Sequence, residues 1–240
     1  MHTTREDGER PTIVLVHGAW ADGSSWEGVI RPLQQAGYHV IAVQNPLTSF
    51  ADDVATTQRV IDAQPGPVVV VAHSYGGAVI TAAAGRPNVR ALVYIAGFAP
   101  DAREPFQALL SRFGDSDVIA ALVPDAAGAL YIDTTKFHEV FCADLPAEQA
   151  NVLAATQKPL AGSIFGASID TPAWKTIPSW YLVTQEDRVI KPELQRFMTQ
   201  RMGARASEIR SSHVAYISHP TEVARLVEEV AGGVMETAAT

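Results

Sequence analysis

Residues Val68–Ile80 read VVVVAHSYGGAVI, and this stretch decides the fold. Its four consecutive valines suit a strand that is buried on both faces, as in parallel sheets covered by helices. The small and β-branched residues from Gly77 onward predict the start of a helix. One serine and two glycines lie between the strand and the helix, so the chain is expected to turn sharply there.

Short β-branched runs recur on both sides of this stretch, and most of them are apolar on both faces. The predicted strands are Thr12–Val16, His39–Val43, Pro67–Ala72, Val89–Ile95, Trp180–Thr184 and Ala206–Arg210. The predicted helices are Trp26–Ala36, Phe50–Gln64, Gly77–Ala84, Pro192–Met202 and Pro220–Val230. This alternation predicts an α/β fold with a mainly parallel sheet and helices on both faces.

The alternation stops between Phe98 and Trp174. This part holds helical fragments at Glu104–Phe113 and Pro146–Gln157, a short extended piece around Ala129–Tyr131, and scattered phenylalanines. One interpretation is a second set of surface helices. We favour a lid that lines a pocket, because the aromatic residues need a surface to cover and ligands bind beyond the carboxyl ends of parallel strands.

The chain is therefore predicted to be a single domain. Its core is expected to comprise residues 11–98 and 175–232, and the lid insertion about residues 99–174. A length of 240 residues, 47% of them hydrophobic, is enough to bury the core of one such unit.

Charge and cysteine content exclude several classes of partner and of structural site. The formal net charge is −8 without a run of Lys or Arg, so neither nucleic acid nor an anionic membrane is expected as a partner. Cys142 is the only cysteine, which excludes an intramolecular disulfide and cysteine-based zinc clusters. Residues 1–11 lack the apolar core of a signal peptide, and no apolar run has the length of a membrane span. We expect a cytoplasmic protein that binds a small, neutral-to-apolar molecule, and a homodimer is compatible with the sequence.

The turn after the third predicted strand is similar to the G-x-S-x-G nucleophile elbow, which leaves a serine hydroxyl projecting from the sheet. Here it reads Ala72-His73-Ser74-Tyr75-Gly76, with alanine in place of the first glycine. A serine before a helix is more often only a cap. The interpretation of Ser74 as a nucleophile therefore depends on an acid and a histidine that follow it in the chain order Ser, acid, His.

Both partners are present in that order. Asp187 comes directly after the strand predicted at Trp180–Thr184, so its carboxylate is expected at the same sheet end as Ser74. Glu186 is the rival acid, and we interpret it as solvated. His213 follows the last predicted strand, on a loop that leads to the helix at Pro220.

Other histidines compete with His213 for the role of base. His17 belongs to the turn after the first predicted strand, and His73 is expected beneath the elbow, so both are interpreted as structural. His219 directly precedes a proline that starts a helix, which is typical of an exposed cap. The remaining histidines have neither an acid nor a nucleophile in their sequence context: His2, His39 and His138.

A serine nucleophile also needs donors for an anionic intermediate. In an elbow one donor is the backbone N–H of the residue after the nucleophile, here Tyr75. The second is expected from the loop after the first strand, "HGAW", where we assign the N–H of Ala19.

With these motifs the chain resembles an α/β-hydrolase. It is most similar to the branch of plant methyl-ester hydrolases, hydroxynitrile lyases and bacterial pyrethroid-hydrolase-like esterases. The similarity runs over nearly the whole chain, in LVHGAW (15–20), WEGVIRPLQQAGYHVIAV (26–43), AHSYGG (72–77), KPLAGSIF (158–165), DRVIKPELQRF (187–197) and SHVAYISHP (212–220). The resemblance implies a catalytic triad of Ser74, Asp187 and His213, oxyanion donors at Ala19 and Tyr75, and neither cofactor nor metal.

The resemblance also defines the alternatives. Hydroxynitrile lyases of this branch carry a lysine after the catalytic histidine and a threonine after the histidine of the first loop, where this chain has Val214 and Gly18. Epoxide hydrolases and haloalkane dehalogenases carry an aspartate at the position of Ser74. Some members of the fold are small-molecule receptors without chemistry. The activity we expect is hydrolysis of a small, largely apolar carboxylic ester through an acyl-enzyme.

Overall fold

A computed structural model of the chain describes residues 10–238, so His2 lies outside the described residues. Six strands form one sheet in the order β2-β1-β3-β4-β8-β9, and every neighbouring pair is parallel. The strands are β1 (Thr12–Val16), β2 (Val40–Val43), β3 (Val68–His73), β4 (Val89–Ile95), β8 (Ser179–Thr184) and β9 (Arg205–Ile209). The predicted α/β fold with a mainly parallel sheet is confirmed.

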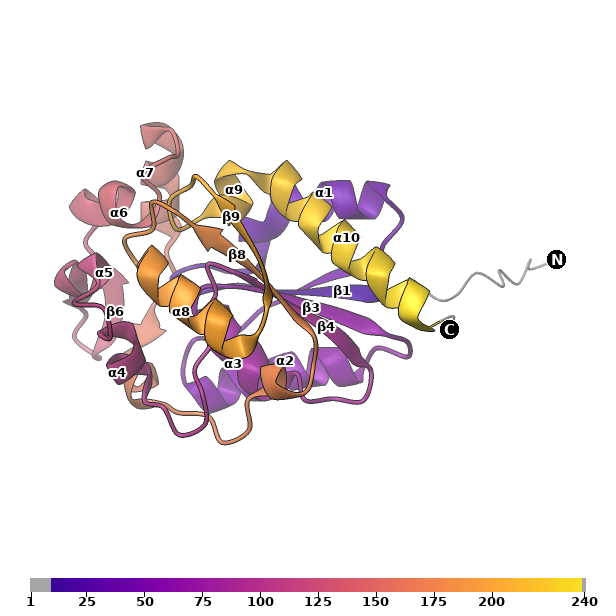
Figure 1. Ribbon diagram of the computed structural model, residues 1–240. Coiled ribbons are helices and arrows are strands. Elements are labelled where there is room, and N and C mark those ends of the chain that lie inside the picture. The colour runs from indigo at the N-terminus through magenta and orange to yellow at the C-terminus, as the bar shows by residue number, and fades with distance from the viewer. Residues whose placement is uncertain (1–9, 239–240) are drawn as a thin grey trace.

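Helices cover both faces of this sheet (Figure 1). Helix α1 (Glu27–Gln35), which follows the 3-10 turn η1 (Gly23–Trp26), packs against α10 (Pro220–Ala238) on one face, next to α9 (Ala215–Ser218). Helices α2 (Phe50–Asp62) and α3 (Tyr75–Ala83) pack together on the other face. Helix α8 (Pro192–Met202) packs against β8. All residues of β3 are buried, as its run of valines predicts.

The residues between β4 and β8, 96–178, which we call the insertion, fold apart from this alternation. They hold α4 (Phe106–Leu110), α5 (Asp117–Ala120), β5 (Leu122–Pro124), β6 (Ala129–Ile132), α6 (Thr134–Phe141), α7 (Ala147–Thr156), β7 (Leu160–Ala161), η2 (Gly162–Gly166) and η3 (Ala173–Lys175). Strands β5, β6 and β7 form a small antiparallel sheet. Figure 1 shows α4 to α7 gathered beyond one end of the large sheet. The lid limits of about residues 99–174 stay a prediction.

The last helix is longer than its sequence pattern indicates. We expected it to end at Val230, whereas α10 continues to Ala238. The core limit at residue 232 stays a prediction. Two consecutive glycines, Gly232 and Gly233, lower helix propensity without blocking the helix. Val234 packs against the core and stabilises the added turn. Within residues 10–238, no helix combines the length and the apolar character needed to cross a bilayer.

Candidate active site

The site is built around the turn from β3 into α3. Ser74 has φ 53° and ψ −128°, a backbone conformation that non-glycine residues rarely adopt and that costs on the order of 1–3 kcal/mol. Neighbouring backbone groups hold it in place. The Ser74 N–H donates to the Ile95 carbonyl (3.2 Å), and the Ser74 carbonyl accepts from the N–H groups of Gly77 and Phe98 (both 2.8 Å). The turn therefore presents the hydroxyl in one fixed direction.

Glycines allow the end of β1 to lie directly against this turn. A Cβ atom at Gly76 would lie 2.6 Å from the His17 carbonyl oxygen and 2.7 Å from that of Val16. A Cβ atom at Gly18 would lie 2.9 Å from the Cβ of Ser74. Backbone atoms cannot yield to such contacts without moving the strand, so side chains at these positions would displace the loop after β1 from the serine.

The structure brings the side chains of Ser74, His213 and Asp187 together. His213 Nε2 lies 2.7 Å from Ser74 Oγ, and His213 Nδ1 lies 2.7 Å from Asp187 Oδ2, with both side chains of the latter pair fully buried. An ionised carboxylate only accepts hydrogen bonds, so Nδ1 carries the proton of the ring. Nε2 is then left to accept the hydrogen bond of the serine hydroxyl.

Both oxygens of the Asp187 carboxylate accept hydrogen bonds. Oδ1 accepts from the backbone N–H groups of Val189 (2.7 Å) and Ile190 (2.9 Å). Oδ2 accepts from the Thr184 hydroxyl (2.9 Å) and the Gln195 amide (2.8 Å), in addition to the imidazole. Four donors besides His213 thus stabilise the ionised carboxylate and fix its orientation.

The residues that competed with Asp187 and His213 for the roles of acid and base make contacts outside this group. The Glu186 carboxylate is half exposed and accepts from Arg210 Nε at 2.7 Å. His138 Nε2 donates to the Leu145 carbonyl within the insertion. His219 closes α9 with its side chain one-third exposed, and none of its described contacts is to the serine or to Asp187.

His17 and His73 support the site as neutral side chains. Burial lowers the pKa of His17 to about 4 and the pKa of His73 well below its usual range. His73 Nε2 donates to the His213 carbonyl at 2.8 Å, and the two rings lie 4.6 Å apart. His17 Nε2 accepts from the Asn45 N–H (3.0 Å), so its Nδ1–H donates to the Gly18 carbonyl (2.9 Å).

The contact from His17 orients the next peptide bond. Because a trans peptide points its C=O and N–H in opposite directions, holding the Gly18 carbonyl also aims the N–H of Ala19. Among the hydrogen bonds of residues 10–238, neither the Ala19 N–H nor the Tyr75 N–H is a donor. Both amides are available to a ligand next to Ser74.

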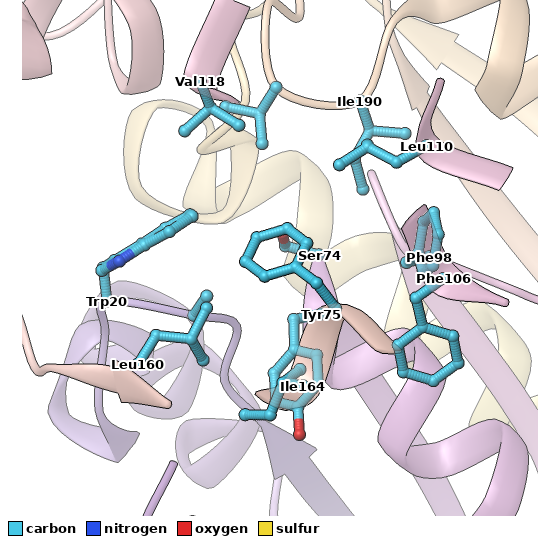
Figure 2. Close-up of a pocket in the computed structure, with 13 residues that line it drawn as sticks. Trp20, Ser74, Tyr75, Phe98, Phe106, Leu110, Val118, Leu160, Ile164 and Ile190 are labelled. Carbon is cyan, nitrogen blue, oxygen red and sulfur yellow. The ribbon is translucent and has the colours of Figure 1, made fainter. Parts of the chain in front are cut away.

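A cavity of about 60 Å³ opens beside the serine (Figure 2). Figure 2 shows Trp20 on one side of Ser74 and Phe98 and Phe106 on the other. The lining residues are apolar apart from Ser74 and Tyr75, and the insertion contributes to the lining on both sides of Ser74. The lining residues are Ala19, Trp20, Ser74, Tyr75, Phe98, Phe106, Leu110, Val118, Leu160, Ile164, Phe165, Val189 and Ile190.

Tyr75 joins this cavity to a buried carboxyl group that the sequence did not reveal. Its hydroxyl points away from Ser74 (Figure 2) and donates to Asp53 Oδ2 at 2.6 Å. The other oxygen of Asp53 accepts from the Leu47 N–H (2.8 Å). Burial raises the pKa of Asp53 and of the Tyr75 hydroxyl.

Sequence reasoning also missed Thr184 and Gln195, the side-chain donors to the acid. Gln195 is fully buried in α8 although it is polar. The signal was available, because Gln195 shares a helix face with the apolar Leu194 and Met198. A buried amide on such a face needs a hydrogen-bond partner.

Comparison with known proteins places the chain in a family. Residues 13–226 match the model of the alpha/beta hydrolase family. A carbendazim hydrolyzing esterase of Nocardioides sp. is 30% identical over 59% of this chain and 63% of its own length. Methylesterase 8 of Arabidopsis thaliana is 23% identical over 78% of this chain and 76% of its own. The crystal structure of a pyrethroid hydrolase from Sphingobium faniae has a TM-score of 0.80 at 21% identity and covers 92% of this chain and 97% of that one. The chain belongs to the alpha/beta hydrolase family, as its motifs indicate.

Proposed function

We propose that the protein is a serine carboxylic-ester hydrolase with Ser74 as nucleophile. The observation that carries the proposal is the continuous line of hydrogen bonds from Asp187 through His213 to Ser74. The family assignment and the relatives named esterase and methylesterase support hydrolysis of an ester.

The geometry supports a two-step mechanism through an acyl-enzyme. His213 Nε2 takes the proton of Ser74 as Oγ attacks the ester carbonyl, and Asp187 stabilises the imidazolium that results. The N–H groups of Ala19 and Tyr75 donate to the oxyanion of the tetrahedral intermediate. His213 then protonates the leaving alcohol. A water molecule, activated by the same imidazole, releases the acid from Ser74.

The cavity favours an ester with a compact apolar group next to the carbonyl. Charged side chains are absent from its lining within the described residues. Its volume of about 60 Å³ is well below the roughly 150 Å³ of an apolar cavity that holds benzene in another protein. Short acyl chains therefore fit without displacing the aromatic side chains of the lining, such as Phe98 and Phe106.

The two alternatives fit less well. A lyase that releases cyanide needs a cation near the leaving group, whereas Val214 is fully buried where such lyases have lysine. A receptor would not require the serine, imidazole and carboxylate to be in hydrogen-bond contact. No feature of the site favours either alternative over the esterase.

Hydrolysis of p-nitrophenyl esters tests the proposal. We expect the acetate and butyrate esters to be turned over faster than the octanoate ester, and Ser74→Ala to abolish turnover of all three. Phe106→Ala, which enlarges the cavity, is expected to shift the preference toward longer acyl chains. Faster cleavage of mandelonitrile than of any ester, or full activity of Ser74→Ala, would overturn the proposal.

A further inference from the structure

Asp144 connects the insertion to the turn that carries His213. It lies between α6 and α7, far from His213 in sequence. Its Oδ2 accepts from the Ser211 hydroxyl (2.7 Å) and the Ser212 N–H (3.0 Å), and its Oδ1 accepts from the Ser212 hydroxyl. One carboxylate thus holds the two residues that directly precede the histidine.

The same turn is held from its other side. The Ser211 carbonyl accepts from the N–H of Glu186 (3.0 Å), in the loop of the acid, and the Ser211 hydroxyl lies 3.0 Å from that of Ser218. The residues before His213 are therefore fixed between the insertion and the acid loop. Asp144 supplies the hydrogen bonds from the insertion to this turn and uses both of its oxygens for them, while the ring of Phe141 packs against that of His213.

Asp144 makes these contacts as an anion. Burial by itself raises the pKa of Asp144, but hydrogen bonds from Ser212 and Ser211 outweigh burial and lower that pKa. The side chain is only 20% exposed, and two titratable groups face it: His219, whose Nε2 lies 3.9 Å from Oδ2, and the buried thiol of Cys142. Hydrogen bonds to an ionised acceptor are about twice as strong as neutral ones, so the turn is held firmly.

We propose that Asp144 is a positioning residue, which keeps His213 at hydrogen-bond distance from both Ser74 and Asp187 by fixing the backbone of Ser211 and Ser212. The inference rests on the proposed function. Small displacements of a reacting group, of the order of 1 Å, can reduce turnover about 100-fold. Releasing the turn is expected to affect proton transfer and to leave the substrate cavity intact, because neither Asp144 nor the two serines line it.

Asp144→Ala tests the inference against Asp133→Ala as a matched control. Asp133 is another carboxylate of the insertion, and it accepts only from the N–H (2.9 Å) and hydroxyl (2.7 Å) of Thr135. With a short-chain p-nitrophenyl ester well below the melting temperature of each variant, we expect Asp144→Ala to lower kcat about 10- to 100-fold with KM within about twofold. Asp133→Ala should keep kcat within about twofold.

Two further variants separate positioning from loss of folding. Ser212→Ala keeps the contact of its backbone N–H with Asp144 and should therefore lower kcat less than Asp144→Ala. The double variant should be no slower than Asp144→Ala, because the contact that Ser212→Ala removes is already lost when Asp144 is replaced. Asp144→Asn keeps one acceptor oxygen and should recover part of the lost kcat. If Asp144→Ala does not fold, the kcat values of Ser212→Ala and Asp144→Asn test the inference instead: both should lie below wild type, and wild-type kcat in both would contradict it.

Equal kcat in Asp144→Ala and Asp133→Ala, or additive effects of Asp144→Ala and Ser212→Ala, would overturn the inference. The inference would also be contradicted if Asp144→Ala raised KM and left kcat unchanged. These outcomes are distinct from failure of the proposed function, which would appear as an active Ser74→Ala variant or as wild-type protein without esterase activity.

Discussion

Replacing Asp187 by asparagine changes one oxygen to an NH₂ group in a place where every neighbour is a donor. If the NH₂ takes the position of Oδ1, it faces the backbone N–H groups of Val189 and Ile190. If it takes the position of Oδ2, it faces the donors of Thr184 and Gln195 together with the imidazole. The first orientation leaves two buried N–H groups without an acceptor. In the second, the Gln195 amide keeps the Thr184 hydroxyl (2.9 Å) and the Ile190 carbonyl (2.7 Å) as acceptors, so the Thr184 hydroxyl is the donor that loses its acceptor.

The expected loss of stability follows from this arrangement. Each buried group left unsatisfied costs about 1–3 kcal/mol, so one or two of them predict a decrease of about 1–6 kcal/mol in the free energy of unfolding. Activity is affected through the tautomer of His213. An NH₂ group at the Oδ2 position favours the tautomer whose proton lies on Nε2, and this form cannot accept the proton of Ser74. We expect kcat to fall by up to about 10⁴, as for the corresponding aspartate of a serine protease.

The assay combines ester hydrolysis with urea unfolding, and Glu186→Gln is the matched control. Glu186 precedes Asp187 and forms an exposed ion pair with Arg210, which is worth about 0–1 kcal/mol. The control should keep kcat within about twofold. If Glu186→Gln is the inactive variant and Asp187→Asn keeps wild-type kcat, the assignment of the acid is wrong.

Three further results are expected. Ser74→Ala should keep the fold and lose turnover by a factor on the order of 10⁶, and an organophosphonate that labels the wild type should leave this variant unmodified. His213→Ala should be about as damaging, whereas His219→Ala should keep turnover close to wild type; the reverse would identify His219 as the base. Stability should fall as the pH decreases from about 6.5 to about 4, because His17 is neutral in the folded protein down to about pH 4 while its unfolded form takes up a proton near pH 6.5. This difference corresponds to about 3 kcal/mol, and urea unfolding at pH 7 and pH 4.5 should show a smaller loss for His17→Gln than for the wild type.

The large sheet could be predicted from sequence because its strands have a strong and local signal. The predicted Thr12–Val16 and Val89–Ile95 coincide with β1 and β4, and the other strand limits differ by one residue. Runs of valine and isoleucine between helical patterns leave little choice of fold. Chain order then placed the serine, acid and histidine at one end of the sheet, where the structure brings them together.

The insertion could not be predicted to the same depth. The extended piece predicted around Ala129–Tyr131 coincides with β6, but β5 and β7 are only three and two residues long, too short for an alternating pattern to distinguish them from loops. Helices α5 and α6 were missed, and α4 is shorter than the predicted fragment Glu104–Phe113. The hydrogen bonds of Asp144 join residues far apart in sequence, and no local pattern reports such a contact.

These long-range contacts show that the insertion does more than cover the cavity. Trp20, which follows Ala19, donates from its indole to the Leu130 carbonyl (3.0 Å) in β6. Ser116 donates from its hydroxyl to the Val189 carbonyl (2.6 Å) in the acid loop. With the contacts of Asp144, and with the Phe98 N–H that donates to the Ser74 carbonyl, the insertion is hydrogen-bonded to all four loops that carry the candidate site.

Moving the insertion as a rigid body would break all of these hydrogen bonds at once and release the loops that hold the reacting groups. A shift of α4 alone would break none of them, because neither Leu130, Ser116 nor Asp144 belongs to that helix. Helix α4 supplies Phe106 and Leu110 to the cavity wall. Under the proposed function, adjustment of this wall is therefore the lower-energy way to admit an ester larger than the cavity, and it leaves the hydrogen bonds between the insertion and the site in place.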